Sequence, residues 1–256
     1  MKRVLTGLLL VITLVIMVSG CRNNSDDDIQ RAAIIDQLYV LESNPEFNEK
    51  ASRMMESYGF TVDIWQGSEI TVDFYRELPT MGYKLIVFRV HSGLLISMEG
   101  DEPAPLDYTY LFTAENYTTT RYVTDQLSDK VSNALISDEY PLVFAVNSHF
   151  ILDAKGRFEN TVILAMGCES YYYNDMPEAF LEKGASAYVG WDTIVSLAHV
   201  DAVTLDLLDN LCTDNATLAE ATAATMADLG EDPYFHAVLR FTPPESADKT
   251  VQELIK

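Results

Sequence analysis

One histidine and one cysteine each follow a long apolar run and lie close to a glycine. His91 follows residues 83–90, with Gly93 two positions further on, and Cys168 follows residues 160–166 and one glycine. A free thiol has a pKa of about 8.5, so it needs a base to become a strong nucleophile at neutral pH. An imidazole can take that proton and later return it. Neighbouring glycines allow close approach of a substrate and expose backbone N–H groups to a developing oxyanion.

This chemistry requires two strands whose ends meet. If the strands over residues 83–90 and 160–166 are parallel neighbours, His91 and Cys168 lie at the same edge of one sheet, on strands about 4.8 Å apart. Functional groups of doubly wound sheets lie at the carboxyl ends of the strands.

Alternating apolar runs and amphipathic segments predict the remaining elements. We expect strands over residues 31–38, 60–65, 83–90, 160–166, 185–191 and 235–241, and helices over residues 47–58, 70–78, 177–183, 200–212 and 217–229. Residues 94–155 are less regular, with β pieces at 94–98, 108–112 and 142–146 and a helix over 124–136. The order predicts an α/β fold: a three-layer α-β-α arrangement with a mostly parallel sheet and an irregular insert at about 94–155.

Two segments resemble the caspase-like cysteine peptidase clan, which includes caspases, gingipains, legumains, clostripain and separases. In that clan one hydrophobic strand ends in His-Gly and a second ends in a small residue followed by the catalytic Cys. The matching segments here are residues 85–93 and 161–170. Residues 179–191 are similar to gingipain and caspase-HetF-associated relatives, in which a helix ends in Gly-Ala and the next strand ends near a Trp.

The resemblance implies a role for each matching residue. Cys168 would be the nucleophile and His91 the general acid and base, and the backbone N–H groups of Gly93 and Cys168 would form the oxyanion hole. Trp191, with Glu169 and Ser170, would flank a substrate pocket.

The sequence departs from the clan pattern in two places. Ser92 stands between His91 and Gly93, where the clan has Gly directly after His, which puts the oxyanion geometry in doubt. The spacing from His91 to Cys168 is long, so residues 94–155 form an insert that could act as a lid, a partner surface or a self-processed loop.

Several alternatives stay open. Cys168 could be a buried small hydrophobe, or it could form a disulfide with Cys212. His149 follows another apolar run and is a weaker candidate base. No zinc-ligand spacing, Gly-rich phosphate loop or Gly-x-Ser-x-Gly elbow is present, so we expect neither a metal nor a cofactor.

The N-terminus predicts export and a lipid anchor. A basic start, an apolar core over residues 4–18 and small residues before Cys21 are typical of a secretory signal, and the Val-Ser-Gly-Cys ending resembles the lipobox of prokaryotic lipoproteins. That resemblance implies lipid attachment at Cys21. We expect a signal peptide over residues 1–20, a flexible tether over 21–30 and one domain over 31–256.

Charge restricts the partners. The chain carries 17 Lys and Arg against 39 Asp and Glu, a net charge of −22. Such a surface repels phosphate backbones, so nucleic acid is excluded as an expected partner. We expect a membrane-anchored, extracytoplasmic cysteine peptidase acting on peptides through a His/Cys dyad. The second hypothesis is an inactive caspase-like lipoprotein that binds a peptide or an envelope component, and the third is a scaffold for a membrane complex.

Overall fold

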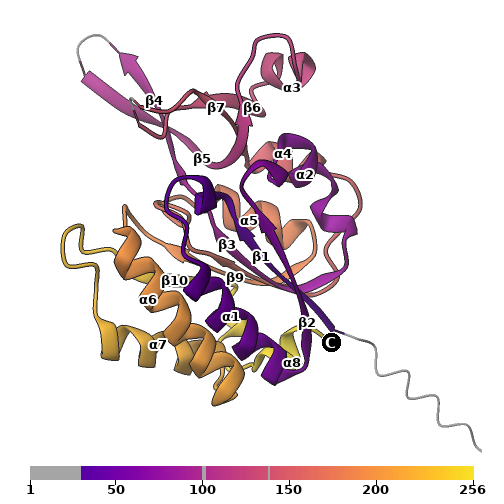
Figure 1. Ribbon diagram of the computed structural model, residues 1–256, viewed down its shortest axis with the longest axis vertical. Helices are drawn as coiled ribbons and strands as arrows, with labels where there is room; N and C mark the ends of the chain where they lie inside the picture. Colours follow the sequence, from indigo (N-terminus) through magenta and orange to yellow (C-terminus); the bar gives the residue numbers. More distant parts are fainter. Residues whose placement is uncertain (1–29, 100–101, 138) are drawn as a thin grey trace, which may run out of the picture.

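The computed structural model describes residues 30–99, 102–137 and 139–256, with the side chains of residues 96–107 left out (Figure 1). The expected signal peptide, Cys21 and most of the tether lie outside the described residues. Sheet A has the strand order β10-β9-β8-β3-β1-β2. Its strands are β1 (Gln30–Asp36), β2 (Phe60–Gln66), β3 (Tyr83–Arg89), β8 (Thr161–Ala165), β9 (Ala185–Trp191) and β10 (Leu239–Thr242). All neighbours pair in parallel except β10, which is antiparallel to β9.

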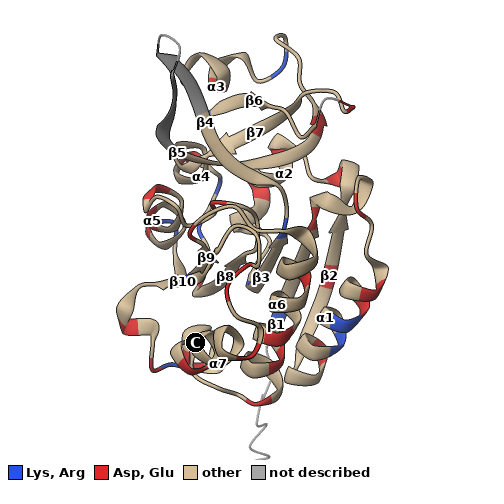
Figure 2. Ribbon diagram, turned by 90° about the vertical axis from the view of Figure 1, so that its left-hand side faces the viewer, with Lys and Arg blue, Asp and Glu red and all other residues tan. Residues whose placement is uncertain are grey.

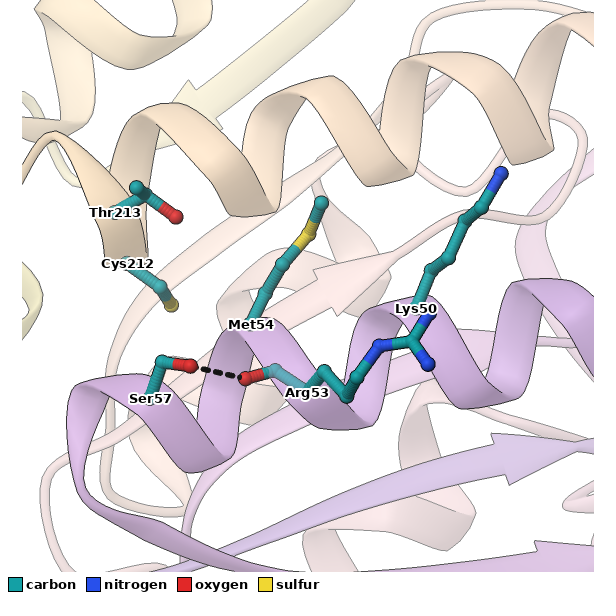
Figure 3. A pocket seen from close by; sticks show the side chains of 6 residues that line it. All are labelled: Lys50, Arg53, Met54, Ser57, Cys212 and Thr213. Carbon is teal, nitrogen blue, oxygen red and sulfur yellow. Dashed lines mark hydrogen bonds between the residues drawn. The ribbon is translucent and has the colours of Figure 1, made fainter.

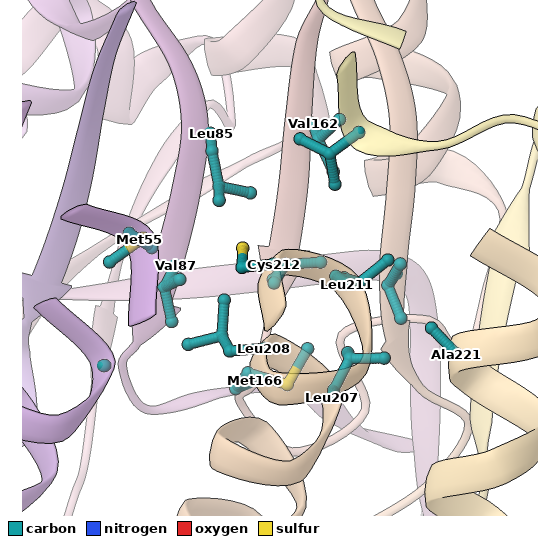
Figure 4. Packing of buried hydrophobic residues seen from close by; sticks show 14 of the residues in the cluster. Met55, Leu85, Val87, Val162, Met166, Leu207, Leu208, Leu211, Cys212 and Ala221 are labelled. Carbon is teal, nitrogen blue, oxygen red and sulfur yellow. The ribbon is translucent and has the colours of Figure 1, made fainter. Parts of the chain in front are cut away.

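Both faces of sheet A are buried, which explains why its central strands are near-continuous apolar runs. One face packs against α1 (Pro45–Tyr58), α6 (Leu197–Leu208), the π-helical turn η4 (Asp209–Thr213), α7 (Leu218–Leu229) and α8 (Val251–Leu254). Figure 4 shows this contact, with Leu85, Val87 and Val162 of the sheet facing Leu207, Leu208 and Leu211. The other face packs against α2 (Val72–Glu77), α4 (Ser148–Asp153) and α5 (Asp175–Glu182).

The first helix follows its local signals. Asn44 caps α1 by accepting the Phe47 N–H, Pro45 occupies the first turn, and Gly59 ends the helix at φ 113°. A positive φ costs glycine little, so this residue type suits the end of a helix. The predicted helix over 47–58 is therefore confirmed, with two more residues at its start.

The insert forms a second, antiparallel sheet rather than an irregular segment. Sheet B has the order β4-β5-β7-β6. Its strands are β4 (Ser92–Glu99), β5 (Glu102–Asn116), β6 (Val131–Ala134) and β7 (Val143–Asn147). The expected α/β class with a mostly parallel main sheet is thus present, accompanied by a separate antiparallel sheet.

The predicted helix over 124–136 is wrong. The helix α3 covers only Val123–Leu127, and Asp129 then adopts φ 56°, which ends the helical path. Residues 131–134 pair with β7 as β6. Pairing with β7 buries Val131 in the core, and this tertiary gain outweighs local helix preference.

Several other boundaries differ from the prediction, among them those of the first strand, the helix over 200–212 and the last strand. The first strand ends at Asp36, and the chain continues as the 3-10 turn η1 (Gln37–Val40). The predicted helix over 200–212 changes to a π-helical turn after Leu208. The last strand begins only at Leu239, because the Asp232 carboxylate accepts backbone N–H groups in the preceding residues and holds them in a turn.

A buried cation fixes the carboxyl ends of β1 and β3. Arg89 is 2% exposed and pairs with Asp36 and with Asp201 of α6, each at 2.8 Å. Its guanidinium also donates to the Glu42 carbonyl and lies 5.5 Å from the Phe47 ring centroid. Each carboxylate thus offsets part of the cost of burying the guanidinium charge, and the network joins two strands to two helices.

Replacing Arg89 should lower the free energy of unfolding by much more than replacing an exposed arginine. We expect Arg89→Met to lower the free energy of unfolding by about 3–5 kcal/mol, because Asp36 is left as a buried carboxylate without its cation. The measurement is urea unfolding of the full chain in detergent micelles, followed by tryptophan fluorescence. Arg53→Met, which removes an exposed helical ion pair with Glu49, should cost about 0.5 kcal/mol or less. Equal losses in the two variants would contradict this role for Arg89.

Candidate functional site

The strands that precede His91 and Cys168 are adjacent and parallel. Phe88 of β3 pairs with Ala165 of β8, and the Met166 N–H donates to the Phe88 carbonyl at 3.0 Å. The ladder itself ends there, and His91 and Cys168 each follow three residues after this last pair, at the same edge of sheet A. The strand arrangement that the proposed chemistry requires is therefore confirmed.

Side chains alternate between the two faces along a strand, and this alternation predicts that His91 and Cys168 lie on the same side of sheet A. Leu85 and Val87 of β3 lie in the core on the α1 and α6 side, as do Val162 and Leu164 of β8. Cys168 packs against that same core. His91 comes at the corresponding alternate position after β3, so the alternation predicts that the imidazole and the thiol project from the same face.

The two chain segments beyond the strands are in close contact. The Ser92 hydroxyl donates to the Cys168 carbonyl at 2.5 Å. A Cβ atom on Gly167 would overlap the Ser92 hydroxyl and lie 2.5 Å from the Val90 carbonyl oxygen. A glycine at position 167 is therefore required for this approach.

The thiol is held by the loop that follows β9. The Cys168 Sγ donates to the Val195 carbonyl at 3.4 Å and lies 3.5 Å from the Val195 nitrogen, whose N–H it accepts. Burial raises the pKa of the Cys168 thiol, and the charges of Glu169 and Asp232 add to this shift. The sulfur is thus a neutral thiol at neutral pH.

The imidazole is neutral as well. Burial lowers the pKa of His91 to about 4, and the positive charge of Arg89 acts in the same direction. Its backbone N–H donates to Gln37 Oε1 at 2.9 Å, and its ring centroid lies 6.1 Å from that of Phe112. In the described part of the chain, no hydrogen bond joins the imidazole to the thiol.

The expected oxyanion role of Gly93 depends on where its backbone N–H points. Gly93 is paired with Tyr110 of β5 in sheet B. The Phe112 N–H donates to the His91 carbonyl, so His91 and Phe112 form a hydrogen-bonded antiparallel pair. Such pairs alternate along a ladder, so Gly93 and Tyr110 form the next one. The Gly93 N–H is accordingly directed at β5, and the Ser92 N–H, at the intervening position, is directed away from β5.

Of the three expected pocket residues, only Glu169 is accessible. Glu169 adopts φ 55°, and its carboxylate accepts the Leu94 N–H and lies 3.6 Å from where a Cβ of Gly93 would be. Ser170 is fully buried, donating to the Ala165 carbonyl and accepting the Trp191 N–H. Trp191 is also fully buried, in the core beneath α6, so neither residue offers a surface to a substrate.

Cys212 and His149 lie apart from this edge. Both Cys168 and Cys212 are free thiols, so the alternative of a disulfide between them is wrong. Cys212 borders a cavity between α1 and η4 (Figure 3), where burial raises the pKa of its thiol to about 12. His149 is exposed on α4, with its ring 4.9 Å from that of Tyr108.

Sequence reasoning missed the groups that hold the site. Asp36, Arg89 and Asp201 form the buried ion network, and Val195 contacts the thiol. The available signal was a charged residue near the end of each of two buried strands, Asp36 and Arg89, since buried charges are seldom left unpaired.

The chain matches no model of a known protein family, and no curated protein shows significant similarity to it. Over the residues that the structure describes, no helix is long and apolar enough to cross a membrane. Nor do three or more His, Cys, Asp or Glu side chains within those residues form a group that could hold a metal ion. Function is therefore argued from geometry.

A side chain at position 167 should disturb the site directly. We expect Gly167→Ala to destabilise the chain by about 1–3 kcal/mol, because the new methyl group overlaps Ser92 and crowds the Val90 backbone. Gly93→Ala is the matched control, since its nearest neighbour is at an ordinary contact distance of 3.6 Å, and it should cost about 0.5 kcal/mol or less. Urea unfolding of both variants tests this, and an equal cost at the two glycines would contradict the close approach.

Proposed function

We propose that this chain is a caspase-like cysteine peptidase of three-layer α-β-α architecture in which Cys168 is the nucleophile and His91 the general acid and base. The observation that supports it most is the parallel pairing of β3 with β8, because the strands that precede His91 and Cys168 then end at the same edge of the sheet. The resemblance of residues 85–93 and 161–170 to the caspase-like clan agrees with this arrangement.

The reaction begins from two neutral groups. As the Cys168 sulfur attacks the peptide carbonyl carbon, its proton passes to a ring nitrogen of His91 and the carbonyl oxygen becomes an oxyanion. In this proposal the backbone N–H of Cys168 stabilises that charge together with the Ser92 N–H, which replaces that of Gly93 because Gly93 is paired in sheet B. The carbon–nitrogen bond then breaks, and the imidazolium returns its proton to the leaving amine. Water, deprotonated by His91, hydrolyses the thioester and restores the thiol.

Substrate binding has to free the thiol before attack. The contacts of the sulfur with Val195 and the absence of a hydrogen bond to His91 in the described residues define a resting state. Displacement of the loop after β9 would release the sulfur toward the imidazole. Catalytic hydrogen bonds of this kind often tighten only in the complex with substrate.

A second candidate function is an inactive peptide-binding or envelope-binding module. The raised pKa of Cys168 and the hydrogen bonds that hold its sulfur to Val195 favour this alternative, since reactive cysteines are usually exposed and have lowered pKa values.

We also propose that the chain is an extracytoplasmic lipoprotein anchored through Cys21. The basic, apolar and small-residue sequence of residues 1–21 supports this, and two acyl chains contribute about 0.8 kcal/mol for each buried methylene. The short polar segment before β1 would leave the domain close to the membrane surface.

Loss of either dyad residue should abolish proteolysis. We expect Cys168→Ala to reduce hydrolysis of fluorescein-labelled casein by about a thousandfold or more and His91→Ala by about a hundredfold or more. Cys212→Ala is the matched control and should retain activity, because Cys212 lies outside the site. Iodoacetamide should also alkylate Cys168 faster than Cys212, and more slowly once His91 is replaced. Casein hydrolysis that survives Cys168→Ala would reject Cys168 as the nucleophile. No hydrolysis by the unmodified chain, together with equal slow alkylation of both thiols, would favour the inactive module.

The pH profile should report a neutral dyad. Because His91 has a pKa of about 4, kcat/KM should fall as the pH drops through that value and the base becomes protonated. At the alkaline end, the raised pKa of Cys168 keeps the thiol protonated, so no decline is expected between about pH 6 and pH 8. A profile of kcat/KM on a fluorogenic peptide tests this, and an acid limb near the ordinary histidine pKa of 6.5 would contradict it.

A further inference from the structure

The outward face of sheet B carries two adjoining cavities. One measures about 380 Å3 and the other about 200 Å3. Both are bordered by the same four residues: Leu95, Tyr110, Ser132 and Asn133. The cavities are therefore two parts of one groove, which we call the sheet B groove.

The groove forms because small residues on β6 and β7 lie next to large aromatic residues on β5. Ser132 of β6 pairs with Ala145 of β7, which in turn pairs with Phe112 of β5. The small residues form the floor, while aromatic rings, among them Tyr108 and Tyr110, stand beside it. Tyrosines offer an apolar ring together with a polar tip, which suits a ligand that is itself amphipathic.

The groove starts beside the candidate dyad. Gly93 and Leu95 border it, and His91 occupies the preceding alternate position on the same face. Phe112, which lies opposite His91 and 6.1 Å from it between ring centroids, also lines the groove. A chain bound in the groove thus leads directly to the imidazole.

Among the described residues, one acidic side chain borders the groove. Asp129 lines the larger cavity, which Gly93 does not border. Residues 92–147 contain nine Asp and Glu but only two basic residues, Arg121 and Lys130. Both are already paired, with Glu115 and Asp153 respectively, whereas Asp129 makes no ion pair within the described residues.

Figure 2 shows the same imbalance along the coloured part of sheet B and its loops, where acidic positions outnumber basic ones. The negative charge of Asp129 and the net charge of −22 favour a positively charged ligand, and the tyrosine rings that line the groove add cation–π attraction.

We propose that the sheet B groove binds an extended peptide segment that carries lysine or arginine, with Asp129 pairing with one of these side chains. This inference rests on the proposed peptidase function and names its substrate class. Asp129 lines the part of the groove that Gly93 does not border, so it would recognise a substrate segment several residues away from the bond that is cleaved at Cys168.

The test measures binding without hydrolysis. The full chain carrying Cys168→Ala, in detergent micelles, is titrated against a fluorescein-labelled octapeptide of alternating Lys and Ala, and binding is followed by fluorescence anisotropy at low ionic strength. We expect Asp129→Asn to weaken binding about three- to fivefold, the size of one exposed ion pair. Asparagine tolerates the φ of 56° at this position, so the variant should fold normally. The matched control is Asp228→Asn, an exposed acid on α7, which should leave binding unchanged.

A second variant tests the shape of the groove. Ser132→Phe fills the floor and should weaken binding by more than about tenfold if the peptide lies there, because it removes the shape complementarity at the centre of the site. Thermal unfolding of each variant separates this effect from misfolding. Equal binding of an alternating Glu and Ala octapeptide, or an unchanged affinity in Asp129→Asn, would overturn the inference. Tighter binding of chitohexaose than of the Lys and Ala peptide would overturn it in favour of a glycan site.

The two proposals fail separately. Peptide binding that weakens in Asp129→Asn, together with no casein hydrolysis by the unmodified chain, supports the groove and rejects the peptidase. Casein hydrolysis together with binding that is indifferent to Asp129 and Ser132 supports the peptidase and rejects the groove.

Discussion

The buried guanidinium of Arg89 determines how the reactive edge of sheet A is built. A cation that is 2% exposed needs carboxylate partners, and it finds Asp36 at the end of the neighbouring strand and Asp201 on α6. The network therefore fixes where β3 ends relative to β1 and to the helical layer. His91 follows two residues later, so its position depends on this anchor. The same positive charge opposes protonation of the imidazole, which links the support of the fold to the chemistry of the site.

The second constraint is the absence of a side chain at Gly167. The strand β3 leaves sheet A and becomes β4 of sheet B within two residues, and this crossing passes close to the turn after β8. Only a glycine permits that approach, and the Ser92 hydroxyl then bonds to the Cys168 carbonyl at 2.5 Å. Ser92, which departs from the clan pattern in the sequence, thus connects the two halves of the candidate site.

Much of sheet A could be predicted from the sequence, because strands buried on both faces leave uninterrupted apolar runs and α1 carries clear capping signals. The parallel pairing of the strands before His91 and Cys168 also agrees with the prediction. The segment over residues 124–136 could not be predicted, since β6 forms only through its pairing with β7, a contact that local propensity does not encode. Trp191 and Ser170 were expected near a pocket from resemblance alone, whereas their burial depends on how α6 and the turn after β8 pack.

The properties of the dyad and of the groove depend on one another. A thiol with a raised pKa and an imidazole with a pKa of about 4 do not form an ion pair on their own, so the proposed proton transfer would need interactions that a bound substrate supplies. Contacts remote from the reacting bond are the usual source of that free energy. The sheet B groove is bordered by Gly93 and Leu94 of β4, the strand that begins directly after His91. Under the two proposals, a peptide held there would extend toward His91, so that recognition of the segment would be coupled to activation of Cys168.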